Sequence, residues 1–133
     1  MDFNIIKKIV EEENKIWIDI EVNKDNEERC YSFELRVISH NDFLEVAIKN
    51  YHDNVLASIE TLNKQIKNWR GIKLKDFTSQ KVKDVLPDDE IPFSFEALET
   101  FLSLHPDVST VLFVKAKQTI EEKREEELKK KQS

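Results

Sequence analysis

The chain has 133 residues, of which 36% are charged and 39% hydrophobic, and its formal net charge is −6. A chain of this length can bury about two-thirds of its surface and fold as one domain without disulfides. It contains a single glycine and a single cysteine, which excludes glycine-rich phosphate-binding loops, internal disulfides and cysteine-based metal clusters. Composition therefore predicts a soluble, intracellular and helix-rich single-domain protein.

The first part of the chain predicts a short helix and a β-hairpin. Residues 3–13 gather apolar side chains on one helical face, and the acidic residues after Val10 predict that the helix stops near it. Two alternating segments follow, 16–22 and 31–37, and the polar stretch 23–29 separates them. We expect an antiparallel hairpin with one apolar and one polar face, whose apolar face packs on a helix.

The strongest periodic signal lies between Leu44 and Trp69, where apolar residues recur at intervals of three and four. This spacing predicts a long central helix on which the N-terminal helix and the hairpin pack. Gly71 stands where a left-handed residue would end such a helix, so we expect the helix to stop there. A third strand within residues 72–92 is left open.

The last third of the chain predicts two further helices. Ser94 can cap the first, and Pro106 fits the first position of the second. From Glu121 onward the residues are almost all charged and form favourable pairs at i and i+4. The predicted fold is therefore α+β, with residues 1–120 as a single α+β domain and 121–133 as a charged helical or disordered tail.

Side chains that could carry chemistry are few and scattered: the histidines at 40, 52 and 105, Cys30, the acidic turn 88–90, and the carboxylates of Asp19, Glu21 and Glu34. No two histidines have metal-ligand spacing, and the acidic turn lacks the alternation and glycine of a calcium loop. We interpret Cys30 as a small apolar filler at the start of a strand. The hairpin carboxylates lie on a solvated face without a cleft. The sequence therefore predicts no catalytic residue, no metal site and no cofactor.

Basic residues run from Lys64 to Lys83 with Asp76 as the single acid, and Trp69 and Phe77 lie among them. Such a strip could follow a phosphate backbone while aromatic rings stack on bases. The chain is acidic on either side of the strip, however, and Trp69 continues an apolar helix face. We therefore expect the strip to be a solvated face or a patch that binds an acidic protein, in preference to a nucleic-acid site.

The order of two short motifs resembles that of a known family. The first motif is Trp69, Arg70, Gly71 and Ile72, and the second is Pro92, Phe93 and Ser94. An apolar helix, a proline-led helix and a charged C-terminus follow. This order is similar to that of the tail assembly chaperones of long-tailed bacteriophages and prophages, and the resemblance spans most of residues 10–130. The chain departs from the pattern at 88–90, where the family often has glycine, and in lacking the family's frequent C-terminal Lys-Asn.

The resemblance implies a non-enzymatic protein that holds the phage tape-measure protein until the tail tube protein polymerises around it. Such a protein acts in the cytoplasm of the bacterial host and is left out of the mature virion. Two alternatives remain open: a structural tail or head-completion protein retained in the virion, and a small nucleic-acid-binding regulator that uses the strip 64–83. Self-association is also left open.

We expect the motif residues to be mainly structural. A partner-binding surface, where the chain has one, is expected on helix faces that the hairpin leaves uncovered, with basic residues beside them. The residues predicted to form it are Phe95, Phe101, Val111, Leu112, Lys73 and Lys75.

Overall fold

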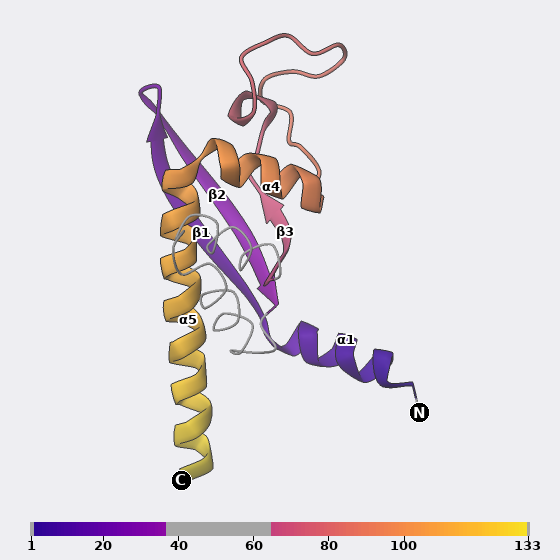
Figure 1. Ribbon diagram of the computed structural model, residues 1–133, viewed down its shortest axis with the longest axis vertical. Coiled ribbons are helices and arrows are strands. Elements are labelled where there is room, and N and C mark those ends of the chain that lie inside the picture. The colour runs from indigo at the N-terminus through magenta and orange to yellow at the C-terminus, as the bar shows by residue number, and fades with distance from the viewer. Residues whose placement is uncertain (1, 37–64, 133) are drawn as a thin grey trace.

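The computed structural model describes residues 2–36 and 65–132, and its fold is α+β (Figure 1). Within these two ranges, the sheet has three antiparallel strands in the order β1-β2-β3. The elements are the helices α1 (Phe3–Glu13), α4 (Phe95–Leu104) and α5 (Pro106–Gln132), the strands β1 (Lys15–Lys24), β2 (Glu27–Arg36) and β3 (Ile66–Arg70), and the 3-10 helix η1 (Leu74–Asp76). Helix α5 runs along β1 and continues beyond the end of the sheet (Figure 1).

The predicted hairpin is confirmed, with longer strands and a tighter turn than expected. Strands β1 and β2 pair along their whole length and leave only Asp25 and Asn26 between them. Both residues have positive φ, 53° and 62°, as in the type I′ turn that matches the twist of a hairpin. The prediction that 23–29 is a connecting loop is therefore wrong, because most of these polar residues pair as strand.

The predicted central helix is wrong at its C-terminal end, because residues 66–70 form the edge strand β3. The rest of that prediction, residues 44–64, lies outside the described residues. Strand β3 pairs with β2 through an irregular register that skips Lys67. A bulge of this kind turns Ile66 and Trp69, three residues apart, toward the same core, where they are 0% and 6% exposed. Their spacing therefore looked helical although the segment is a strand.

The core lies between one face of the sheet and helices α4 and α5. Its fully buried members include Ile20, Tyr31, Phe33, Leu35, Ile66, Leu98, Phe101, Leu102, Val108 and Leu112. The ring of Phe101 lies at its centre, 5.2 Å from the ring of Tyr31 and 5.9 Å from that of Trp69. Both contacts are edge-to-face, the geometry that aromatic pairs prefer. The sheet therefore packs on the two C-terminal helices.

The two predicted C-terminal helices are confirmed, and their starting residues act as expected. The Ser94 hydroxyl accepts a hydrogen bond from the backbone N–H of Ala97 at 3.0 Å. Pro106 is the first residue of α5, where its missing N–H costs nothing. Helix α5 then continues without a break to Gln132.

Helix α1 is also confirmed, but it runs to Glu13 instead of stopping near Val10. Asn14 explains the extension, because its side-chain amide donates to the Val10 carbonyl at 2.7 Å and its backbone N–H also bonds to the last turn. None of the residues of α1 is buried, and the helix leads away from the sheet (Figure 1).

An ion pair joins the hairpin to the start of α5. The Lys24 ammonium donates to the Asp107 carboxylate at 2.8 Å, and this hydrogen bond lowers the pKa of Asp107 below its ordinary value of 3.8. A carboxyl whose pKa is lowered by folding stabilises the protein above its unfolded pKa. That contribution is lost as the pH falls through the lower, folded pKa.

Replacement of Lys24 by methionine is expected to lower the free energy of unfolding near neutral pH by less than about 1 kcal/mol, because the pair is solvent-exposed. The effect should shrink further below pH 3.8 as Asp107 becomes protonated. Urea unfolding at pH 7 and pH 2.5 checks this, since urea does not screen charges as guanidinium does. A loss that is equally large at both pH values would show that the ion pair is not its cause.

Candidate partner-binding surfaces

The two family-like motifs lie side by side in the structure. The indole N–H of Trp69 donates to the Ile91 carbonyl at 2.8 Å, and the Trp69 ring meets the Phe93 ring edge-to-face at 5.4 Å. The backbone N–H of Ile91 donates to the Ile72 carbonyl at 2.8 Å. Trp69 and Ile72 are buried and Phe93 is half-buried, whereas Pro92 is exposed. Most of these motif side chains therefore hold two chain segments together.

Gly71 has φ +81°, so the predicted left-handed conformation is confirmed. The predicted reason was wrong, because Gly71 follows a strand and ends no helix. A Cβ atom built on Gly71 would lie 2.4 Å from the carbonyl oxygen of Cys30 on β2. Only glycine allows this close approach of two backbones.

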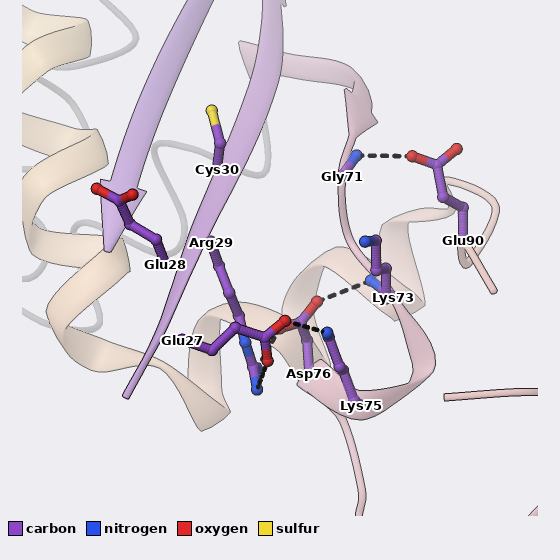
Figure 2. A pocket seen from close by; sticks show the side chains of 9 residues that line it. All are labelled: Glu27, Glu28, Arg29, Cys30, Gly71, Lys73, Lys75, Asp76 and Glu90. Carbon is purple, nitrogen blue, oxygen red and sulfur yellow. Dashed lines mark hydrogen bonds and ion pairs between the residues drawn. The ribbon is translucent and has the colours of Figure 1, made fainter. Parts of the chain in front are cut away.

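A charged pocket of about 320 Å³ lies between β2 and the segment that follows β3 (Figure 2). It is lined by Glu27, Glu28, Arg29, Cys30, Gly71, Lys73, Lys75, Asp76 and Glu90. Arg29, Glu27 and Lys75 converge near Asp76, whereas Glu28 points away from this group (Figure 2). Glu90 accepts a hydrogen bond from the backbone N–H of Gly71 at 3.1 Å.

Asp76 is the centre of a buried network. Its carboxylate accepts hydrogen bonds from Arg29 Nη1 at 2.8 Å, from the Tyr31 hydroxyl at 2.6 Å and from the backbone N–H of Lys73 at 2.8 Å. The side chain is 1% exposed, and that of Arg29 is 12% exposed. Burial, followed by the bond to Asp76, raises the pKa of Tyr31, which therefore stays a neutral hydrogen-bond donor. The network connects β2 to η1.

The rim of the pocket is a second, exposed network around Lys75. The Lys75 ammonium lies 2.6 Å from the Glu27 carboxylate and 2.8 Å from that of Asp88. These hydrogen bonds raise the pKa of Lys75 and lower the pKa values of Glu27 and Asp88. Lys75 was predicted to contact a partner, but its ammonium already has two carboxylates. Lys73, predicted with it, lines the pocket.

Among the described residues, those that line this pocket include no histidine and no hydroxyl group. Cys30 itself is exposed, which overturns its interpretation as an apolar filler. His105 does not line the pocket; its Nε2 lies 2.6 Å from the Asp76 carbonyl oxygen, and its ring centroid lies 4.7 Å from that of Phe101, with the two rings tilted by 41°. Across the described ranges, no three His, Cys, Asp or Glu side chains gather as metal ligands.

Two of the residues predicted to bind a partner are in the core. Phe101 and Leu112 are both 0% exposed, because the sheet covers the faces of α4 and α5 that carry them. The prediction that the hairpin leaves these faces open is therefore wrong. Phe95 is 55% exposed at the start of α4, with its ring 5.6 Å from that of Phe93 and the Lys67 ammonium 5.4 Å away.

Helix α5 exposes an apolar surface on the side opposite the core. Val111 and Val114 are 42% and 47% exposed, and Thr110 and Gln118 are exposed beside them. We call these four residues the outer face of α5; their spacing places them on one side of the helix. Val111 was predicted to contact a partner, and Val114 was not. The signal was present in the sequence, because residues 108–114 contain no charge in a chain that is 36% charged.

The basic strip at 64–83 is divided among several environments. The Arg70 guanidinium stacks on the Trp17 ring at 3.8 Å, while Lys75 is ion-paired. Trp69 is only 6% exposed, so its ring is not available to stack on a base. This geometry gives the nucleic-acid alternative no support.

No protein-family model, curated protein or solved structure matches the chain. The structural support for a function is therefore the geometry of the surfaces described above. Within the described part of the chain, no helix is both long and apolar enough to cross a bilayer.

Proposed function

We propose that this chain acts by binding and not by catalysis, as a tail assembly chaperone for the tape-measure protein of a long-tailed phage or prophage. The observation that carries the proposal is the outer face of α5, where Val111 and Val114 are exposed in an uncharged run. The order of the motifs around Trp69 and Phe93, which resembles that of the tail assembly chaperones, also supports the proposal. The proposed site of action is the cytoplasm of the bacterial host, before the virion matures.

The outer face of α5 suits a helical client. Residues 108–114 carry no charge on any side of the helix over about two turns, and here the core buries only one side of them. Exposed side chains at i and i+3 form a ridge that can pack into the groove of another helix. The same surface would shield an apolar stripe of a long helical client from aggregation.

In this proposal the two parts of the chain have different roles. The described residues up to 120 form the folded body, which presents the outer face of α5. Residues 121–132 continue α5 as a charged extension, in which Glu125, Glu126, Lys129 and Lys130 are exposed. The extension is polar on almost all of its sides, as is typical of a helix that stays in water, and in this proposal it keeps the end of the complex hydrated.

The expected result is that the tagged chain, isolated from its induced phage or prophage host, brings down a very long helix-rich protein together with a tail tube subunit. Introducing glutamate at both Val111 and Val114 should reduce that recovery about tenfold or more, because charges would then be buried in the interface. Mass spectrometry of the bound fraction and of purified virions measures both points.

The matched control places the same pair of charges on exposed positions of α4, as Thr100→Glu/Ser103→Glu, and should leave recovery unchanged. Thermal melts establish that both double variants are folded. Recovery of nucleic acid or host regulators in place of the tail proteins would refute the proposal. Finding the chain in purified virions would favour a structural tail or head-completion protein.

A further inference from the structure

We draw no further inference here: the strongest candidate, the apolar side of helix α1 on which Phe3, Ile5 and Ile9 are exposed, carries none because nothing in the described part of the chain shows what covers it.

Discussion

Replacement of Asp76 by alanine is expected to lower the free energy of unfolding by about 3–5 kcal/mol, the usual cost of removing one partner of a buried ion pair. The change leaves the Arg29 guanidinium, 12% exposed, without its buried counter-charge. It also removes the acceptor of the Tyr31 hydroxyl and of the Lys73 backbone N–H. Urea unfolding followed by circular dichroism measures the loss.

A double-mutant cycle with Arg29→Met separates the ion pair from the other two bonds. If Arg29 and Asp76 interact as described, the double variant should lose about 1–3 kcal/mol less unfolding free energy than the sum of the two single losses. Asp76→Asn should be milder than Asp76→Ala, since an amide oxygen can still accept from Tyr31. Additive losses would show that the Arg29–Asp76 ion pair is not what stabilises this junction, whereas equal effects of asparagine and alanine would show that an uncharged acceptor contributes nothing in place of the carboxylate.

The elements that could be predicted from the sequence are those whose signals are local. Alternation over 16–22 and 31–37 gave the hairpin, because a side-chain period of two is a property of one strand. Ser94 and Pro106 gave the starts of α4 and α5, because capping involves only the next few residues. Asp25 and Asn26 are also a local turn signal, because both residue types tolerate positive φ. The tight turn could therefore have been predicted from them.

Strand β3 could not be predicted in the same way, because it depends on a distant partner and on a bulge. The spacing of Ile66 and Trp69 fits a helix as well as a bulged strand, and only pairing with Phe33 and Leu35 of β2 decides between them. The burial of Phe101 and Leu112 could not be predicted for a similar reason. A helical pattern shows which residues share a face but not which element covers that face.

The candidate surfaces were partly visible in the sequence. The charge-free run 108–114 could have drawn attention to Val114, and the single acid within the basic strip is Asp76. Its partner Arg29 is 47 residues away, so no local pattern joins the two.

Gly71 combines a positive φ, which would strain a residue with a side chain, with a close backbone contact, so its replacement should also be costly. Gly71→Ala is expected to lower the free energy of unfolding by about 2–4 kcal/mol, from a positive φ penalty of about 1–2 kcal/mol and a backbone shift of similar cost. The Cβ atom would lie 2.4 Å from the Cys30 carbonyl oxygen, and that oxygen belongs to the backbone of β2 and cannot rotate away. Relief requires β2 and the segment after β3 to separate, which would also strain the Arg29–Asp76 junction beside them.

Asn26→Ala provides the matched comparison, because Asn26 also has positive φ, 62°, but lies in the exposed hairpin turn and already has a Cβ atom. It should therefore show only the conformational penalty, and the difference between the two variants isolates the close approach at Gly71. Gly71→Val should be worse than Gly71→Ala, since a β-branched side chain is less tolerant of positive φ. Equal losses for Gly71→Ala and Asn26→Ala would show that β2 yields easily at Cys30. The contact between the two segments would then be looser than the Trp69–Phe93 packing beside it implies, because rigid packing on both sides of Gly71 is what makes an added methyl group costly.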